Sequence, residues 1–398
     1  MKISSPRVDL AFPRHVWLQP SHIRGLPHTI VSTNSDHFAG SGVGFGIDAL
    51  DTSVGEFLER HHFYRDVEQS STAKLSAVLH PREAHEFIDA LTKTCGRRYS
   101  RNFLEEHIFS MVPAFRMKDL TPCQIPRACV TLDYGHGGID DDIYPNRDTC
   151  GCSFHLNAEQ ALFGSIKEYV ERQLLLKCWL TNTCNRVLET SEILNTLSAH
   201  RARHLFSYYT SLGKLKILDI SDPQFPGSCI LVLYGNPSDD HPVKYCAGMG
   251  FAQSLASSLE KALIELWQTF RFMSNFLSSG RSADQIKDGY LKYFISCNTF
   301  STYVRWASTE NTGSASTNNK TFCLSEFIDS LNRTGANGYF YISVRRRLNK
   351  NYVFSKFISP CFFLHMNNAH GCNLDNHFSR NFKNNVCPYR LNSMVPFP

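Results

Sequence analysis

The chain lacks any long apolar run: within its 398 residues no stretch approaches the roughly 20 consecutive apolar residues of a membrane span. Its first residues, Met1 to Pro6, do not lead into the apolar core of a signal peptide. The 14 cysteines are irregularly spaced and include no Cys-x-x-Cys pair, which is unlike a small disulfide scaffold. We therefore expect a soluble, cytoplasmic protein with reduced thiols and no membrane partner.

The chain also lacks a strong excess of charge of either sign. It has 41 basic and 36 acidic residues, a formal net charge of +5. Nucleic-acid-binding proteins usually carry a concentrated basic stripe, so we expect no nucleic-acid partner. The motifs GxxxxGK[ST], HExxH and GxSxG are absent as well. The length allows two or three domains, and 42% hydrophobic with 19% charged residues is typical of globular proteins.

What the chain does contain is a repeated motif. Residues 53–60, Ser-Val-Gly-Glu-Phe-Leu-Glu-Arg, recur in spacing and chemistry at 165–172, Ser-Ile-Lys-Glu-Tyr-Val-Glu-Arg. A looser third copy is 262–268, Ala-Leu-Ile-Glu-Leu-Trp-Gln. Each copy predicts a helix whose two acidic or amide side chains lie on one face, about 4.5 Å apart along the axis.

The acidic side chains of these repeats stand among core residues, where an unpartnered carboxylate is costly. If the three helices pack together, their acids converge and repel one another unless protons or cations are present. Mg²⁺ suits such ligands, because it is commonly held by one or two carboxylates together with substrate phosphates. The predicted metal ligands are Glu56, Glu59, Glu168, Glu171 and Glu265, and the arginines placed to meet phosphate oxygens are Arg60, Arg172 and Arg271.

This pattern indicates ATP-dependent chemistry, with acids for Mg²⁺ and arginines for the phosphates. The alternative is a set of surface helices with local salt bridges, which is the better interpretation of a single copy. Two matching copies and a third partial one, each in an apolar helix, favour the metal–phosphate site.

Strand-like segments precede the motif helices, which predicts an α/β or α+β fold with helices on one side of a sheet. The glycine-rich segment 40–46 has two interpretations, a phosphate cradle or a flexible turn, and the missing P-loop ending favours the turn. The other expected elements are an irregular arm over 1–39, helices at 74–95, 157–179 and 254–276, strands at 128–134, 216–220 and 229–235, a mobile loop at 307–321 and a hairpin at 339–354.

Two pairs of reactive side chains also have alternative interpretations. Cys150 and Cys152 could act as nucleophile or metal ligand, but packing or turn roles are favoured because no partner residues lie nearby in the sequence. His61 and His62 could bind metal, but adjacent side chains point to different faces, which favours a role in the last turn of the first motif helix.

On these residues the chain resembles the YcaO family, whose nucleotide site is built from glutamates on helices. The family's first segment reads Ser-x-x-x-Glu-x-x-Glu-Arg, and Thr52 takes the Ser position here. The match is carried by Thr52, Glu56, Glu59 and Arg60, then by Glu168, Glu171 and Arg172, and finally by Glu265, Gln268 and Arg271. Segments 144–155, 363–368 and 394–398 resemble the cyclodehydratase members in particular. The chain departs from the family at Thr149-Cys150-Gly151, where many members have Ser-Asn-Gly, and at Gln160, where an acid is common.

The resemblance implies a YcaO-type fold with a mixed or antiparallel sheet. It implies one large domain over 40–398, with sub-units around 40–150, 151–280 and 281–390 and a tail, 391–398, that enters the active site. It further implies ATP and Mg²⁺ as cofactors, nucleotide contacts from Thr52, Arg60, Arg147, Ser165, Gln268 and Arg271, and catalytic roles for Arg172 and the C-terminal carboxylate of Pro398.

The reaction implied by the resemblance is an ATP-dependent cyclodehydration of Cys, Ser or Thr residues in a precursor peptide. The expected products are thiazolines and oxazolines, with ATP converted to ADP and phosphate. A leader-binding partner subunit and an FMN-dependent azoline dehydrogenase are the implied protein partners. The alternatives are a non-catalytic scaffold that binds substrate and a related enzyme that makes thioamides or amidines.

Overall fold

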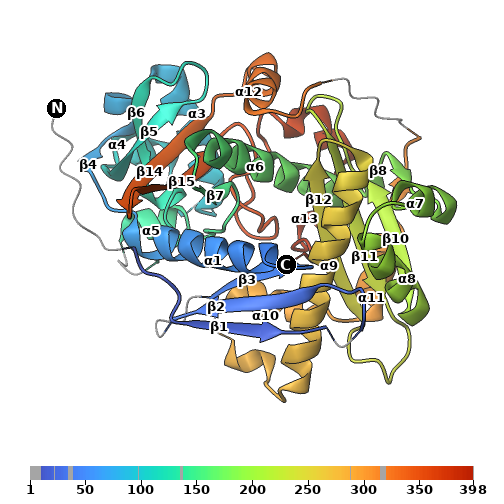
Figure 1. Ribbon diagram of the computed structural model, residues 1–398. Helices are drawn as coiled ribbons and strands as arrows, with labels where there is room; N and C mark the ends of the chain where they lie inside the picture. The colour runs from blue at the N-terminus through green and yellow to red at the C-terminus, as the bar shows by residue number, and fades with distance from the viewer. Residues whose placement is uncertain are drawn as a thin grey trace.

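The computed structural model describes residues 10–21, 23–34, 39–96, 98–134, 138–286, 288–313 and 320–397. Its first sheet is antiparallel and consists of β1 (His15–Gln19), β2 (His28–Thr33) and β3 (Ala39–Gly44), with α1 (Asp48–His61) packed on β2 and β3 (Figure 1). The irregular arm expected over 1–39 is therefore wrong for β1 and β2. The β-branched residues of β2 favour a strand, and the nearby prolines and histidines obscured that preference.

The second sheet has six strands. Its strand order is β4 (Ser71–Ala73), β5 (Phe109–Arg116), β14 (Tyr339–Arg347), β15 (Lys350–Ile358) and β7 (Cys152–His155), and β6 (Pro122–Pro126) pairs with β5. All of its pairs are antiparallel, and α6 (Ala158–Thr181) packs on β7 and β15. The hairpin expected at 339–354 is confirmed, and the sheet unites segments from both ends of the chain.

The third sheet has the order β12 (Tyr245–Ala252), β11 (Ser228–Gly235), β10 (Lys214–Asp219) and β9 (Arg186–Val187), and α9 (Leu255–Ser278) packs on β12 and β11. The strands and the helix expected in this region are thus confirmed. The short strands β8 (Thr183–Cys184) and β13 (Glu310–Asn311) form a parallel pair. The predicted class, α and β elements with a mixed or antiparallel sheet, is confirmed in its antiparallel form for the three larger sheets.

The remaining helices surround these sheets. They are α2 (Leu75–Val78), α3 (Pro81–Thr94), α4 (Arg101–Glu106), α5 (Ile139–Ile143), α7 (Thr190–Thr196), α8 (Ala202–Leu212), α10 (Gly289–Ser296), α11 (Phe300–Ala307), α12 (Leu324–Arg333) and α13 (Pro388–Leu391). Of the loop expected at 307–321, residues 310–311 form β13 and 314–319 lie outside the described residues. Within the described ranges, no helix is both long and apolar enough to cross a membrane.

Two expected elements differ from the structure. The helix expected at 74–95 is two helices, because Pro81 starts a new one and the residue before a proline disfavours helical dihedrals. The strand expected at 128–134 is wrong: Arg127–Cys129 forms a 3₁₀ turn, and the backbone N–H of Leu132 donates to the Phe63 carbonyl (2.8 Å) outside any strand ladder. Its residues Ala128 to Leu132 are buried and Tyr134 is exposed, and no strand among the described residues pairs with the segment.

Candidate functional site

Each motif helix follows a strand at the edge of a different sheet: α1 follows β3, α6 follows β7 and α9 follows β12. The edge of β3 donates the backbone N–H of Ser41 to Glu56 Oε2 (2.7 Å). The edge of β12 does the same, with the N–H of Met249 donating to Glu265 Oε2 (2.9 Å). Edge strands present unpaired N–H groups. Two motif carboxylates therefore tolerate apolar surroundings because each accepts a hydrogen bond from a strand edge.

Glycines on both sides of these donors let the helices approach the strands. A Cβ on Gly42 would lie 1.9 Å from the carbonyl oxygen of Ala49, and one on Gly250 would lie 2.2 Å from that of Ser258. Only glycine permits such a close approach of helix to strand. The segment 40–44 belongs to β3, so neither a phosphate-cradling turn nor a flexible turn describes it.

Glu59, on α1, is partly buried and accepts a hydrogen bond from the backbone of Phe154, on the edge strand β7. Burial, followed by the charge of Glu56, raises the pKa of Glu59 to about 7. Burial also raises the pKa of Glu168, on α6, well above its ordinary value, and the charges of Glu59 and Glu171 add to this effect. The acids of α1 and α6 therefore face each other.

Arg172 joins this group to the acid of the third helix. Its Nε lies 3.9 Å from Oε1 of Glu168, and although burial disfavours the charged guanidinium, the charges of Glu168 and Glu265 raise its pKa above the ordinary value. Burial raises the pKa of Glu265 to about 7, with Arg172 opposing the shift and Glu171 adding to it. Figure 1 shows α1 and α6 stacked in the view, with α9 standing across their ends. Acids of α6 and α9 thus share Arg172, and Glu168 also interacts with Glu59 of α1.

The last residues of the chain dock against the same arginine. The Arg172 guanidinium carbon lies 5.1 Å from the centroid of the buried Phe397 ring. The tail is held by its backbone, since the hydroxyls of Tyr245 and Tyr293 donate to the carbonyls of Pro396 (2.6 Å) and Met394 (2.5 Å). Pro398 itself lies outside the described residues.

The other residues expected to bind nucleotide differ in their exposure and in their contacts. Arg60 is 2.5 Å from Glu56, and 44% of its side chain is exposed. Ser165 is buried on α6, and its hydroxyl donates to the Leu162 carbonyl (2.8 Å). The hydroxyl of exposed Thr52 donates to its own helix, at the Asp48 carbonyl (2.8 Å). On α9, Gln268 is partly buried, and Arg271 lies 5.7 Å from the centroid of the Trp267 ring.

Arg147 is not directed at the acids. Its side chain is 1% exposed and forms an ion pair with Asp141, of α5, and a hydrogen bond to the Asp133 carbonyl. Its guanidinium carbon also lies 5.0 Å from the centroid of the Tyr134 ring. These contacts tie the loop before β7 to α5, which is a structural role.

Neither pair of reactive side chains is arranged for chemistry. Burial raises the pKa of Cys150 and Cys152 well above the ordinary value for a thiol, so neither is an activated nucleophile. His62 is fully buried beyond the end of α1, with Nε2 3.2 Å from the Tyr341 hydroxyl and Nδ1 3.6 Å from Asp66. Among the residues that the structure describes, no three Asp, Glu, His or Cys side chains form a group that could hold a metal ion.

The donor set nevertheless fits Mg²⁺ bound together with a polyphosphate. Mg²⁺ takes one or two protein carboxylates and completes its shell with phosphate oxygens and water, so it does not need three converging acids. The carboxylate oxygens of Glu59 and Glu265 are hard ligands, and the pKa values of both groups are raised because burial disfavours the charged form. A cation bound among them would stabilise the charged carboxylates.

Two further residues near this site, Lys356 and Asn368, lie outside the repeated motif. Lys356, on β15, is 4% exposed, donates from Nζ to the Asp148 carbonyl (2.9 Å) and lowers the pKa of Glu59 by its charge. A lysine in the middle of the apolar segment 352–358 was a signal that could have revealed it. Asn368, whose Oδ1 accepts the backbone N–H of Val395 (2.9 Å), lies in the segment 363–368 that carries the family resemblance, but the sequence did not indicate its contact with the tail.

Comparison with known proteins identifies a family, a curated relative and solved structures to which the chain is similar. The model of the family described as YcaO cyclodehydratase, ATP- and Mg²⁺-binding, matches residues 42–350. The microcin B17-processing protein McbD of Escherichia coli is 31% identical over 399 residues, covering 98% of both chains. The chain also matches a chain of the E. coli microcin synthetase McbBCD complex with pro-MccB17 bound, with a TM-score of 0.89, 30% identity and 98% coverage of both chains.

A more distant match shares the fold alone. YcaO from Methanopyrus kandleri, solved with AMPPCP and Mg²⁺ bound, gives a TM-score of 0.57 at 12% identity. The match covers 89% of this chain and 86% of that one.

Proposed function

This chain belongs to the YcaO cyclodehydratase family, which binds ATP and Mg²⁺, and we propose that it converts Cys, Ser or Thr residues of a precursor peptide to thiazolines or oxazolines. The observation that carries the proposal is that Glu168 interacts electrostatically with Glu59 of a second helix and with Arg172, which also interacts with Glu265 of a third. The relative McbD is named as a microcin B17-processing protein, which supports a peptide substrate.

The reaction proceeds in two stages. The side-chain thiol or hydroxyl of the peptide attacks the carbonyl carbon of the preceding residue and gives up its proton, so that a five-membered ring with an oxyanion forms. That oxygen takes the γ-phosphoryl group of ATP, releasing ADP, and then leaves as phosphate while the ring nitrogen loses its proton and the C=N bond forms. Mg²⁺ supplies charge neutralisation for the transferred phosphoryl group.

The chain's own residues bind and orient the reactants. Glu56, Glu59, Glu168, Glu171 and Glu265 are the proposed Mg²⁺ ligands. Thr52, Arg60, Ser165, Gln268 and Arg271 are the proposed nucleotide contacts. Arg172, the cation among the acids, stabilises charge on the phosphoryl group. The backbone N–H groups of Ser41 and Met249 each hold one oxygen of Glu56 and Glu265. The other oxygen of Glu56 is 2.5 Å from Arg60, so a ligand that binds there would share the carboxylate with this arginine.

The C-terminal tail is the proposed source of a base. Phe397 packs against Arg172, which supports placing the Pro398 carboxylate within reach of the reacting peptide. A carboxylate there would accept the proton of the attacking side chain or position the amide. The protein acts as one domain over 40–398, with the tail as part of its active site.

We further propose that the chain works in the cytoplasm as part of a complex. The matched E. coli structure contains McbBCD with pro-MccB17, which supports a leader-binding subunit and an FMN-dependent azoline dehydrogenase as partners. All 14 cysteines are free, as expected in a reducing compartment that also supplies ATP.

The central experiment combines the chain with its partner subunits, precursor peptide and Mg-ATP, and follows the peptide mass. Each ring should remove the mass of one water molecule, with one ADP and one phosphate formed. Formation of AMP would exclude transfer of the γ-phosphoryl group. A requirement for added sulfide would instead identify a thioamide-forming enzyme.

A double substitution separates catalysis from scaffolding. Glu56→Gln/Glu168→Gln removes two proposed Mg²⁺ ligands from two helices while keeping side-chain volume, so ring formation should fall by at least about a hundredfold. Glu260→Gln, on a partly buried acid of α9 paired with His200 (2.9 Å), is the matched control. Ring formation at the full rate in the double variant would establish a scaffold that serves another enzyme.

A further inference from the structure

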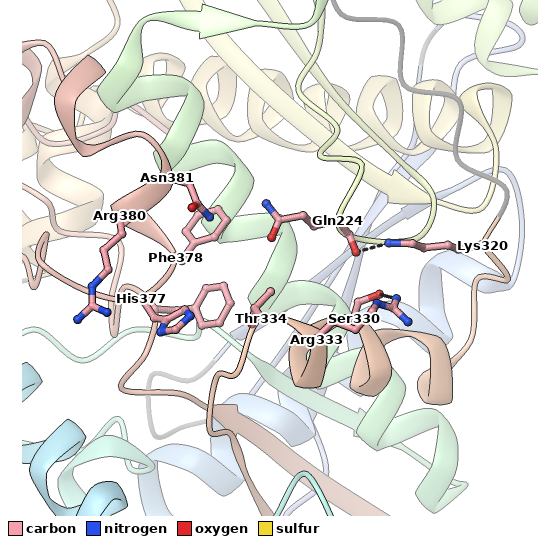
Figure 2. Close-up of a pocket in the computed structure, with 10 residues that line it drawn as sticks. Gln224, Lys320, Ser330, Arg333, Thr334, His377, Phe378, Arg380 and Asn381 are labelled. Atoms are coloured by element: carbon pink, nitrogen blue, oxygen red, sulfur yellow. Dashed lines mark hydrogen bonds between the residues drawn. The ribbon is translucent and has the colours of Figure 1, made fainter.

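Two hollows lie on either side of the segment 334–338, near α12 and α3 at the top of the view in Figure 1. The larger encloses about 500 Å³ and is lined by Lys320, Arg333 and Arg380, which come from three different segments (Figure 2). The smaller encloses about 300 Å³ and is lined by Arg82, Arg116 and Lys118 among others. We call these two hollows together the paired-hollow face.

The hollows adjoin each other. Thr334 lines the larger and Ala336 the smaller, so only Gly335 separates them along the chain. Nη2 of Arg82 donates to the Gly335 carbonyl (3.0 Å) from one side, and the ring of His377 lies 3.9 Å from the Cβ position of Gly335 on the other. An extended chain laid across Gly335 would touch both hollows.

Positive charge is concentrated on this face. Among the described residues, no Asp or Glu lines the larger hollow, whereas Glu83 and Asp119 line the smaller one. Glu83 is already paired with Arg116 (2.8 Å). Some of the cations are also partnered, since Arg333 meets Glu326 (2.9 Å) and Lys320 donates to the Pro223 carbonyl (3.0 Å).

A cationic excess remains after this pairing. Arg82 also forms an ion pair, with Glu86 (3.0 Å). The other three cations that line the hollows, Lys118, Lys320 and Arg380, outnumber the one other acid, Asp119. Burial and the charge of Arg333 lower the pKa of Lys320, so the cations of the larger hollow repel one another. An anionic ligand would relieve that repulsion.

The polar groups between the cations favour a peptide over a nucleic acid. Gln224, Asn381 and Ser330 offer amides and a hydroxyl, which suit the N–H and C=O groups of a peptide backbone. The aromatic rings of the larger hollow, Phe362 and Phe378, are buried and stack on each other at 5.0 Å. They leave no free aromatic face on which a base could stack.

We propose that the paired-hollow face binds an extended acidic peptide segment. None of its residues belongs to the motif helices or to the tail, so this binding is separate from the ATP site. It does not depend on the function proposed above, because the face carries its own charge and shape.

The test uses the full chain and a fluorescent peptide of alternating Glu and Ser, about twelve residues and so roughly 40 Å long when extended. Fluorescence anisotropy gives its Kd, which is expected below about 1 mM. The comparison probes are the same peptide with Lys in place of Glu and a single-stranded oligonucleotide of equal charge. The variant Lys118→Glu/Arg380→Glu changes one exposed cation in each hollow.

The variant is expected to weaken binding of the acidic peptide at least about tenfold, or ~1.4 kcal/mol. The matched control, Arg346→Glu/Lys350→Glu, makes the same charge change at two exposed positions of the β14–β15 hairpin and should leave the Kd within about twofold. Absence of binding, an equal loss in the control, or tighter binding of the oligonucleotide than of the peptide would overturn the proposal. ATP turnover without peptide should be the same in both variants, which keeps this result separate from the catalytic one.

Discussion

The guanidinium carbon of Arg172 lies 5.1 Å from the centroid of the Phe397 ring, which couples a central charge of the site to the end of the chain. Arg172 also lies against Glu168 (3.9 Å) and is influenced by the charge of Glu265. The tail therefore helps to place the cation that the acids of two helices share. We therefore expect changes at the C-terminus to lower the rate of ring formation more than they lower the stability of the fold.

Extending the tail tests this coupling. A few residues added after Pro398 would displace the terminal carboxylate while leaving the carbonyls of Met394 and Pro396 bound to Tyr293 and Tyr245. We expect ring formation to fall by at least about a hundredfold, the size typical for loss of a positioned proton acceptor, with little change in melting temperature. The same residues added before Met1 are the control. Full turnover by the extended chain would remove the carboxylate from the mechanism.

Stability of the ligand-free protein should depend on pH through the acids of the site. Glu59 and Glu265 have pKa values of about 7 in the folded chain against an ordinary value of 4.5. Because the folded state holds these protons more tightly, their contribution to stability is fully present below about pH 4.5 and is lost as the pH rises through 7. Ionisation of each group should lower the free energy of unfolding by about 1–3 kcal/mol across that window.

Melting temperatures across this window measure the effect. Glu265→Gln cannot ionise, so its melting temperature should fall less with pH than that of the unaltered chain. Mg-ATP should also reduce the fall, because the cation neutralises the ionised carboxylates. If the melting temperature of the Glu265→Gln variant depends on pH in the same way as that of the unaltered chain, the pKa of Glu265 is not raised by folding.

A single methyl group at Gly42 should separate β3 from α1. Its Cβ would lie 1.9 Å from the Ala49 carbonyl oxygen, so the helix must move and carry Glu56 away from the N–H of Ser41. We expect Gly42→Ala to lower the free energy of unfolding by about 1–3 kcal/mol and to raise KM for Mg-ATP. Gly46→Ala, where no atom lies within 4 Å of the new Cβ, is the control and should stay within about 0.5 kcal/mol.

Substitution of Arg147 distinguishes a role in nucleotide binding from a structural role in an ion pair. Because it is buried against Asp141, Arg147→Ala should destabilise the protein by about 3 kcal/mol, and Asp141→Ala in the same chain should recover part of that loss. KM for ATP of the folded enzyme should hardly change. A large rise in KM without loss of stability would restore the nucleotide contact that the family resemblance implied.

The local elements of the site could be predicted because their signals lie close together in the sequence. The three motif helices follow from their apolar periodicity, and the start of α6 follows from Asn157, whose Oδ1 accepts the backbone N–H of Gln160 (3.1 Å). The strand expected at 128–134 failed because a strand needs a neighbour to pair with, and none lies beside it. Gly42 was misread for a similar reason, since its role is set by a helix carbonyl it touches only in the fold.

The sequence by itself determined which residues are acidic and which helices carry them, because residue type and periodicity are local properties. It also indicated that positive charge is needed among these acids. The tertiary structure alone decided which acids meet, that Arg147 pairs with Asp141, that Lys356 joins the site and that Phe397 of the tail lies against Arg172. These contacts join residues far apart in the chain. Their distances are set by the three sheets, whose edge N–H groups hold Glu56, Glu59 and Glu265 in place.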